Sequence, residues 1–320
     1  MGKAFSLAEM AEKWKKYGSF AVFCHVRPDG DTIGSAIALR EYLLATGKKA
    51  DLFCSDVIPD SFRFFKPTED FRTEITAKYD AFVAVDCASA DRLGDLASAF
   101  LNAENTFNID HHVSNERYAK YNFVRDRAAN CENIYELFTL SATALSATAA
   151  RALLLGISTD TGNFAHKNVT GNTLRVAGAL VDAGADLNLI SYEMFKRQSK
   201  ARAKLFGNVV SKIRYALSGT LAIAVITTAD LSAAGAKPSE TEGIIDFVLS
   251  IDGVGVAASV LETGDLRYKI SFRSKKTDVN GVAGMFGGGG HTLASGCMIA
   301  GYLEDVIDKI TFAVSRFTEE

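Results

Sequence analysis

Histidine and aspartate side chains that could hold metal ions occur in four segments of the first half of this sequence. The first segment, His25 to Asp31, places one imidazole and two carboxylates within seven residues, directly after an apolar run. The chain has only five histidines, and three of them fall within these segments. The candidate metal ligands are His25, Asp29, Asp31, Asp86, His111 and Asp160. A mixed imidazole and carboxylate set favours Mn²⁺ or another transition ion over Ca²⁺ or a purely oxygen-bound Mg²⁺.

This set of ligands is larger than one ion needs. Two ions bridged by a carboxylate and a water are the usual device for hydrolysing phosphate esters. For one aspartate alone, such as Asp86 or Asp160, the alternative is a helix cap or a turn. Coincidence across four segments favours a shared site, so the pattern predicts two-metal phosphoesterase chemistry.

The elements that must position these residues are short strands alternating with helices. Apolar runs predict strands at residues 20–24, 52–54, 81–85 and 106–109. Helical spacing predicts helices at residues 33–44, 132–140, 144–155 and 174–181. This alternation is typical of a mostly parallel, helix-covered sheet, in which the carboxyl ends of the strands lie along one edge. Three candidate segments follow strands and should converge there, while Asp160 lies in a turn-forming stretch that could reach the same edge.

The second half of the chain shows a different pattern. We predict an α/β protein with a catalytic metal-binding domain (1–187), a charged helical connector (188–212) and a smaller α/β domain with a mixed sheet (213–320), with a cleft between the domains. Strands of the smaller domain are expected at 221–227, 254–261 and 266–272, and helices at 239–250 and 303–317.

Composition excludes several classes of function. Over 320 residues the net charge is -3, so the chain has no global basic field for gripping long duplex nucleic acid. No apolar stretch approaches the roughly 18 residues that span a bilayer, and the N-terminus lacks the apolar core of a secretory signal. Five scattered cysteines without a Cys-x-x-Cys pair favour reduced thiols. We therefore expect a cytoplasmic protein that is not bound to membranes.

Four motifs together resemble the DHH phosphoesterase superfamily with a DHHA1 second domain. In chain order they are His25-x-x-x-Asp29-x-Asp31, Asp110-His111-His112, Gly156-x-x-x-Asp160-Thr161-Gly162 and Gly287-Gly288-Gly289-Gly290-His291. The stretch from Asp86 to Gly94 fits the NrnA-like branch, the bifunctional oligoribonucleases and phosphatases of adenosine 3′,5′-bisphosphate (pAp). The resemblance spans the chain from the first of these motifs to the last.

The resemblance implies two Mn²⁺ ions, with Mg²⁺ or another divalent ion as the alternative. One ion would be held by His25, Asp29 and Asp86. The other would be held by Asp31, Asp86, His111 and Asp160. Asp86 would then bridge the ions. Asp110 would orient an imidazole, and His112 would face the substrate phosphate as a hydrogen-bond donor or as the acid for the leaving oxygen.

The resemblance also implies substrate contacts in the second domain. Ser271-Phe272-Arg273-Ser274 resembles a phosphate-binding motif of the family, and glycine-rich loops let backbone amides approach an anion. The implied contacts are Ser271, Arg273, Gly288, Gly289, Gly290 and His291. From Arg267 to Lys275 cations alternate with apolar residues, and for Lys269 and Lys275 we favour an edge strand whose charges discourage aggregation.

The expected activity is Mn²⁺-dependent hydrolysis of short oligoribonucleotides (nanoRNA) to mononucleotides, of pAp to AMP and phosphate, or of both. A cyclic-dinucleotide or pApA phosphodiesterase and a catalytically silent nucleotide-binding sensor stay open as alternatives, as do a homodimer and the direction of attack on RNA. The sequence departs from relatives at Asn130-Cys131-Glu132, which puts a substrate contact there in doubt. It also departs at His166, which either stacks on a base or is simply exposed.

Overall fold

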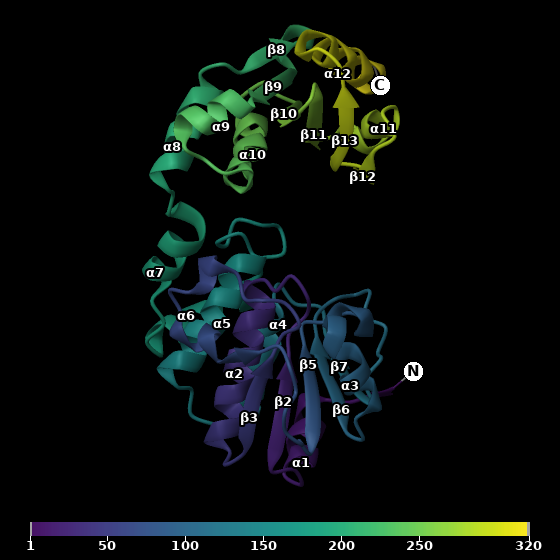
Figure 1. Cartoon of the computed structure of the whole chain (residues 1–320). Coiled ribbons are helices and arrows are strands. Elements are labelled where there is room, and N and C mark those ends of the chain that lie inside the picture. The colour runs from purple at the N-terminus through teal and green to yellow at the C-terminus, as the bar shows by residue number, and fades with distance from the viewer. Residues whose placement is uncertain (1, 319–320) are drawn as a thin grey trace. The chain divides into compact units, whose positions relative to one another are not determined.

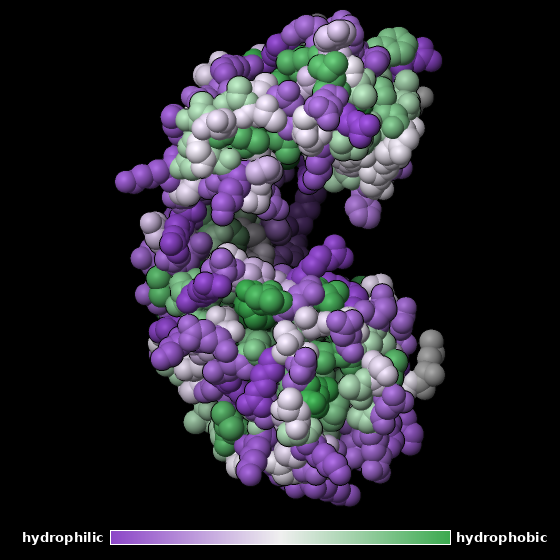
Figure 2. Space-filling model, in the orientation of Figure 1, coloured by the Kyte–Doolittle hydropathy of each residue, from purple (hydrophilic) through white to green (hydrophobic). Residues whose placement is uncertain are grey.

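A computed structural model describes residues 2–318 and divides the chain into two compact units (Figure 1). The first unit ends at Arg197 and the second begins at Gln198, so the residues of the expected connector divide between the units. No helix in the described range is long and apolar enough to cross a membrane. On the face drawn in Figure 2, hydrophobic side chains are scattered among hydrophilic ones.

The first unit contains a seven-stranded sheet in the order β1-β7-β6-β5-β2-β3-β4, with every neighbouring pair parallel. Its strands are β1 (Lys3–Ala4), β2 (Ser19–Phe23), β3 (Lys49–Phe53), β4 (Phe71–Arg72), β5 (Ala81–Val85), β6 (Thr106–Asp110) and β7 (Tyr121–Val124). Its helices are α1 (Leu7–Trp14), α2 (Gly30–Ala45), α3 (Ala97–Asn102), α4 (Asn130–Leu140), α5 (Ala147–Asp160), α6 (Gly171–Asp182) and α7 (Leu187–Ser191). The four predicted strands and the parallel sheet are confirmed.

Helices cover both faces of this sheet, which explains why its strands are almost wholly apolar. Along β2, Phe20 and Val22 are buried in a core shared with α1, α2, α4 and α5. Ala21 and Phe23 point to the other face, where they join a smaller core with α3. Alternate residues of one strand therefore enter two different cores, and the strand is fixed in register from both sides.

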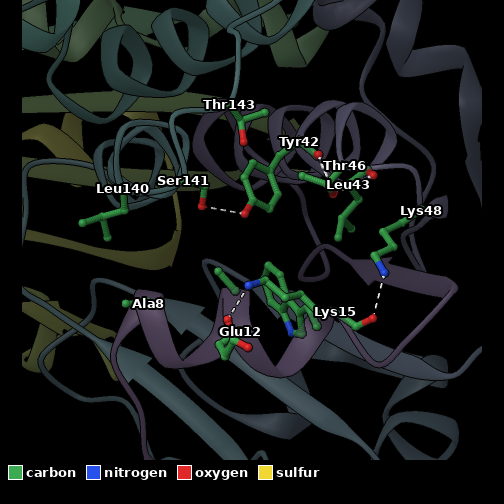
Figure 3. A pocket seen from close by; sticks show the side chains of 12 residues that line it. Ala8, Glu12, Lys15, Tyr42, Leu43, Thr46, Lys48, Leu140, Ser141 and Thr143 are labelled. Atoms are coloured by element: carbon green, nitrogen blue, oxygen red, sulfur yellow. Dashed lines mark hydrogen bonds and ion pairs between the residues drawn. The ribbon is translucent and has the colours of Figure 1, made fainter.

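A pocket of about 570 Å³ lies beside α1 and the C-terminal ends of α2 and α4 (Figure 3). Tyr42 and Ser141 share a hydrogen bond of 2.8 Å in its wall. The pocket is at the end of α2 opposite to Asp31, so it is separate from the predicted metal site.

The second unit contains a mixed six-stranded sheet in the order β12-β13-β11-β10-β9-β8, which confirms the predicted mixed sheet. Its strands are β8 (Arg214–Ala216), β9 (Leu221–Ile226), β10 (Val256–Gly264), β11 (Arg267–Ser274), β12 (Gly289–His291) and β13 (Ala294–Ala300). Its helices are α8 (Lys200–Val210), α9 (Thr228–Ala234), α10 (Ile244–Ser250), α11 (Val279–Gly284) and α12 (Leu303–Thr318). Of the pairs, only β9 and β10 are parallel.

Two sequence predictions for this unit are wrong. The helix expected at 239–250 is a short 3₁₀ turn, Pro238–Thr241, followed by α10, because Gly243 between them adopts a left-handed backbone with φ 78°. The edge strand expected around Lys269 is instead β11, an interior strand that pairs with β10 on one side and β13 on the other. Edge protection therefore cannot explain the cation at Lys269.

Candidate functional site

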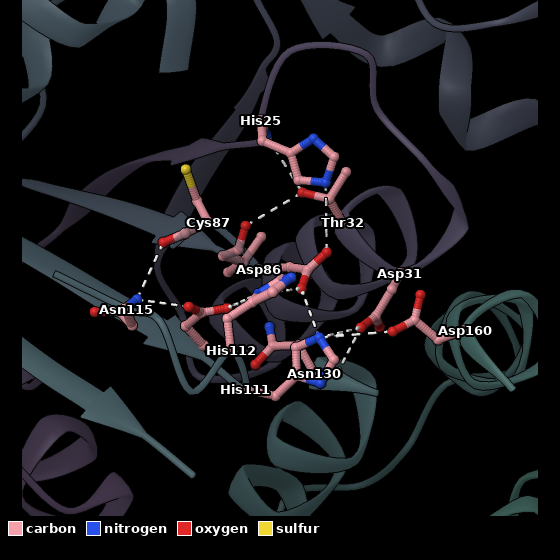
Figure 4. A network of polar contacts seen from close by, with 12 residues as sticks. His25, Asp31, Thr32, Asp86, Cys87, His111, His112, Asn115, Asn130 and Asp160 are labelled. Carbon is pink, nitrogen blue, oxygen red and sulfur yellow. Dashed lines mark hydrogen bonds and ion pairs between the residues drawn. The ribbon is translucent and has the colours of Figure 1, made fainter. Parts of the chain in front are cut away.

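The carboxyl ends of three neighbouring strands position most of the predicted metal ligands. His25 follows β2, Asp86 follows β5, and Asp110 ends β6 just before His111. β2 and β5 are adjacent, and the chain continues outward from them in opposite directions. Open α/β sheets bind ligands at such a reversal of strand order, outside the carboxyl ends of the strands. Figure 4 shows these side chains converging on a common centre.

Asp29 serves both the local helix and the site. It is the N-cap of α2, and its Oδ1 accepts hydrogen bonds from the amides of Asp31 (3.1 Å) and Thr32 (3.2 Å). Its Oδ2 lies 3.5 Å from Nε2 of His25. One carboxylate oxygen therefore starts the helix, while the other faces the metal cluster.

Close packing of α2 against α5 brings Asp31 and Asp160 together. A side chain at Gly156 would place its Cβ 2.3 Å from Sγ of Cys131 and 2.8 Å from Oδ1 of Asp31, so the helices can approach only with glycine here. Asp160 is the last residue of α5. We expected this residue in a turn, and the structure corrects that: the helix continues through it.

Asp31 is fully buried and is held by the N-terminus of α4. Its Oδ2 accepts a hydrogen bond from the amide of Asn130 (2.5 Å) and its Oδ1 from the amide of Cys131 (2.9 Å). The α4 end contributes here through its backbone, so the contact does not depend on the side chains of Asn130 and Cys131. Sequence reasoning missed this contact, since a backbone donor leaves no signal in residue types.

Asp86 is the centre of the cluster. Its Oδ2 lies 3.6 Å from Nε2 of His25, while its Oδ1 lies 3.3 Å from Nε2 of His111. The side chain is 2% exposed, and Oδ1 is buried without a hydrogen-bond partner among the described residues. The backbone at Asp86 is left-handed, with φ 53°. Strain of this kind is concentrated at functional sites, where the surrounding structure maintains it.

Backbone carbonyls orient the two ligand histidines. Nδ1 of His25 lies 2.8 Å from the carbonyl of Val26 and 3.1 Å from the guanidinium of Arg92, and Nδ1 of His111 lies 3.0 Å from the carbonyl of Arg127. Nε2 of each ring faces the carboxylates of the cluster. Both imidazoles are therefore held with Nε2 toward the predicted metal positions.

Asp110 holds His112 and stands apart from the ligand set. Its Oδ1 accepts a hydrogen bond from Nδ1 of His112 (2.8 Å), and its Oδ2 accepts one from Asn115 (2.5 Å). The bond with Asp110 raises the pKa of His112, whose side chain is one-third exposed. His112 is thus oriented at the rim of the cluster, and its protonated form is favoured by Asp110.

The charges of the cluster perturb one another strongly. Burial on its own would lower the pKa of His25, but Asp29 and Asp86 outweigh it and raise the pKa to about 10. Burial, together with the charges of Asp86 and Asp160, raises the pKa of Asp31 well above its usual value. So many buried carboxylates need a cation between them.

The donor atoms fit a pair of metal ions. Two groups of residues, each with ligand atoms within 4.8 Å of one another, are His25-Asp29-Asp86 and Asp31-His111-Asp160. Nε2 of His111 is 3.6 Å from Oδ2 of Asp160 and 3.9 Å from Oδ2 of Asp31. Ligands about 2.1 Å from a shared ion are separated by such distances. A third group, Asp86-His111-His112, shares the carboxylate of Asp86 with the first group and the imidazole of His111 with the second.

The second unit places the predicted substrate contacts on one strand face and its edge. Arg273 on β11 pairs with Ala294 on β13, which pairs with His291 on β12, so both predicted contacts lie in one row across the sheet. Ser271 lies in the next row on the same face. Residues paired directly across a sheet project from the same side.

The glycine-rich segment differs from the open loop that we expected. Gly289–His291 forms β12, the amide of Gly288 donates to the carbonyl of Ala283 (3.0 Å), and that of Gly290 donates to Oδ1 of Asn280 (2.8 Å). Both amides are therefore engaged within the unit. His166 is exposed, with Nδ1 3.4 Å from the carbonyl of Asp160.

Two family models match this chain, one for each unit. The model of the DHH family, N-terminal domain, matches residues 19–157, and that of the DHHA1 domain matches residues 218–320. A crystal structure of an exopolyphosphatase-related protein from Bacteroides fragilis has the same fold, with a TM-score of 0.81 at 22% identity over 97% of this chain and 96% of that one.

The chain is also similar to curated bacterial proteins along nearly its whole length. It is 31% identical to the bifunctional oligoribonuclease and PAP phosphatase NrnA of Thermus thermophilus, over 93% of this chain and 89% of that protein. The Bacillus subtilis protein of the same name is 28% identical over 95% of this chain and 96% of its own length. The chain therefore belongs to the DHH phosphoesterase family, in the NrnA-like branch that carries a C-terminal DHHA1 domain.

Proposed function

We propose that this protein is a Mn²⁺-dependent two-metal phosphoesterase that hydrolyses short oligoribonucleotides to mononucleotides and pAp to AMP and phosphate. The observation that carries the proposal is the position of Asp86 between two imidazoles: its two carboxylate oxygens lie 3.6 Å from Nε2 of His25 and 3.3 Å from Nε2 of His111. The names of the relatives from Thermus thermophilus and Bacillus subtilis support this choice of substrates.

Each residue of the cluster has a separate task in this proposal. One ion would be held by His25, Asp29 and Asp86, and the other by Asp31, Asp86, His111 and Asp160. Bound ions lower the pKa of an attacking water and neutralise charge on the phosphoryl oxygens. Because contacts at Nδ1 hold both imidazoles with Nε2 toward the carboxylates, the rings need no rotation before binding.

His112 would complete the hydrolysis. Water adds to phosphorus, the bond from phosphorus to the ribose oxygen breaks, and that oxygen needs a proton. His112 is positioned by Asp110, has a raised pKa and is partly exposed, so it would donate that proton to the leaving oxygen. Arg273 and His291 would hold another phosphate of the substrate from the second unit.

A panel of substrates tests this function. Purified protein with Mn²⁺ is given RNA of two to five nucleotides, pAp, pApA, cyclic di-AMP and pyrophosphate, and the products are separated by chromatography. We expect turnover of short RNA and pAp. Preferential turnover of cyclic di-AMP or pApA would identify the protein as a cyclic-dinucleotide or pApA phosphodiesterase. Tight nucleotide binding without turnover would identify it as a catalytically silent nucleotide sensor.

A further inference from the structure

We propose that the face of the second sheet opposite to α11 and α12 contains two contact rows, and that the row containing Lys269 binds the second nucleotide of an RNA substrate. This inference rests on the proposed function and divides its two substrates. RNA would use both rows, whereas pAp, which has a single nucleoside, would use one. The evidence comes from the strand register, the charges and the small residues between the rows.

The two rows follow from the pairing of β10, β11, β13 and β12. The first row contains Arg273 and His291, joined through Ala294 of β13. The second row contains Leu261, Lys269 and Met298, because Lys269 pairs with both neighbours. Paired residues share a face, so both rows project from the side of the sheet opposite to α11 and α12. Helices α8, α9 and α10 pack on this side over β9 and β10, with Leu261 against their core.

The row between them is made only of small residues. Ser271 pairs with Ser259 on β10 and with Gly296 on β13, and Gly296 pairs with Gly289. This row of two serines and two glycines therefore projects less far from the sheet than the long side chains of the two rows beside it. A flexible, hydrogen-bonding chain such as a ribose-phosphate backbone can lie along such a row without steric conflict.

Lys269 has the surroundings of a phosphate contact. It is exposed, it lies on an interior strand, and it takes part in no ion pair among the described residues. Together with Ser271 and Arg273 it lines a pocket of about 400 Å³. Glu242 and Asp246 line the same pocket, and Oδ1 of Asp246 lies 3.7 Å from Nε of Arg273. Met298 beside it is 54% exposed, although methionine on a soluble protein usually packs inside. A free ammonium next to an exposed thioether suits one phosphate and one base.

The separation of the rows sets the length of the ligand. Lys269 and Arg273 are four residues apart on one strand, so their Cα atoms are roughly 13 Å apart at about 3.3 Å per residue. The two phosphates of pAp are attached to a single ribose and lie closer together than this. With both side chains standing straight out from the sheet, a phosphate held at Arg273 leaves Lys269 beyond the second phosphate of pAp but within reach of a longer chain.

The experiment compares Lys269→Met with the wild-type protein on pAp and on RNA of three to five nucleotides. The methionine keeps the length of the side chain and removes its charge. We expect KM for RNA to rise several-fold while KM for pAp changes less than twofold. The slope of log KM for RNA against log salt should become shallower by about 0.7, the value for one phosphate contact to a single strand. Lys309→Met, on the exposed face of α12, is the matched control.

A binding assay makes the result independent of turnover. Fluorescein-labelled pentaribonucleotide is titrated with each protein in EDTA, which prevents metal-dependent hydrolysis, and unlabelled pAp competes with it. Weaker RNA binding by Lys269→Met alone, with unchanged competition by pAp, supports the second row. Equal losses for RNA and pAp, or RNA binding and salt slope equal to wild type, would overturn the inference. Failure of the wild type to hydrolyse any phosphate ester would instead refute the proposed function.

Discussion

Replacing Asp86 by asparagine should remove both metal ions while leaving the fold intact. Asparagine has nearly the same shape and tolerates a left-handed backbone, so φ 53° is no obstacle to folding. The amide, however, is a poor ligand and carries no charge. Because each oxygen of Asp86 faces a different imidazole, one substitution weakens both ion sites.

The magnitude follows from the position of the carboxylate. Loss of a residue that only supports a metal ligand costs about 10- to 100-fold in affinity or activity. Loss of a ligand shared by two ions should exceed that for each ion, so we expect kcat/KM to fall by at least about a thousandfold. Alanine at the same position adds roughly 1–2 kcal/mol of backbone strain. The melting temperature of Asp86→Ala should therefore lie roughly 2–8 °C below that of Asp86→Asn when both are measured in EDTA.

The assay measures bound Mn²⁺ by mass spectrometry after dialysis, with hydrolysis of pAp in parallel. Asp182→Asn, an exposed carboxylate at the end of α6, is the matched control and should retain the metal and activity of the wild type. Two bound Mn²⁺ ions and near-normal turnover in Asp86→Asn would refute the bridging role.

Three further predictions concern the packing, protonation and acid group of the site. Gly156→Ala should destabilise the protein by about 1–3 kcal/mol and weaken Mn²⁺ binding, because the new Cβ collides with Cys131 and Asp31. In the control Gly178→Ala the new Cβ meets nothing within 4 Å, so this variant should not be destabilised. Equal melting temperatures for the two variants would contradict the packing argument. In protein stripped with EDTA, the pKa of His25 is raised to about 10, so this imidazole is protonated at pH 8. Mn²⁺ binding should therefore displace its proton and become tighter as pH rises. Calorimetry in buffers of different ionisation enthalpy measures the proton release, and identical heats of binding in all buffers would count against it. Asp110→Asn should lower kcat at least tenfold, because the Asp110 side chain orients His112. The Mn²⁺ content should not change, because the predicted metal ligands do not depend on this carboxylate. A loss of Mn²⁺ would instead make Asp110 a metal ligand.

The parallel sheet and the convergence of the ligands were predictable because both depend on local signals. Apolar runs marked the strands, and strand ends in a parallel sheet share an edge, so the approach of His25 to Asp86 followed from topology alone. The helical position of Asp160 was not predictable in this way. Its segment contains Gly156 and several hydroxyl residues, which are typical of turns, but packing against α2 keeps it helical.

Contacts between residues distant in the chain account for the other features that the sequence did not predict. The interior position of β11 depends on pairing with β13, whose segment of small residues gives a weak strand signal in the sequence. That same partner converts Gly289–His291 from a loop into a strand. Backbone amides at Asn130 and Cys131 hold Asp31 from about a hundred positions away, and residue types do not show such contacts.

Trp14 is the only tryptophan of the chain, and it is buried in the first unit, where its ring meets Phe20 and Phe107 edge-on. The second unit has no tryptophan. Emission excited at the indole band therefore reports the unfolding of the first unit alone, whereas circular dichroism reports both units. Comparing the two signals during denaturation would show, without labels or truncation, whether the halves of this protein unfold as one cooperative unit or separately.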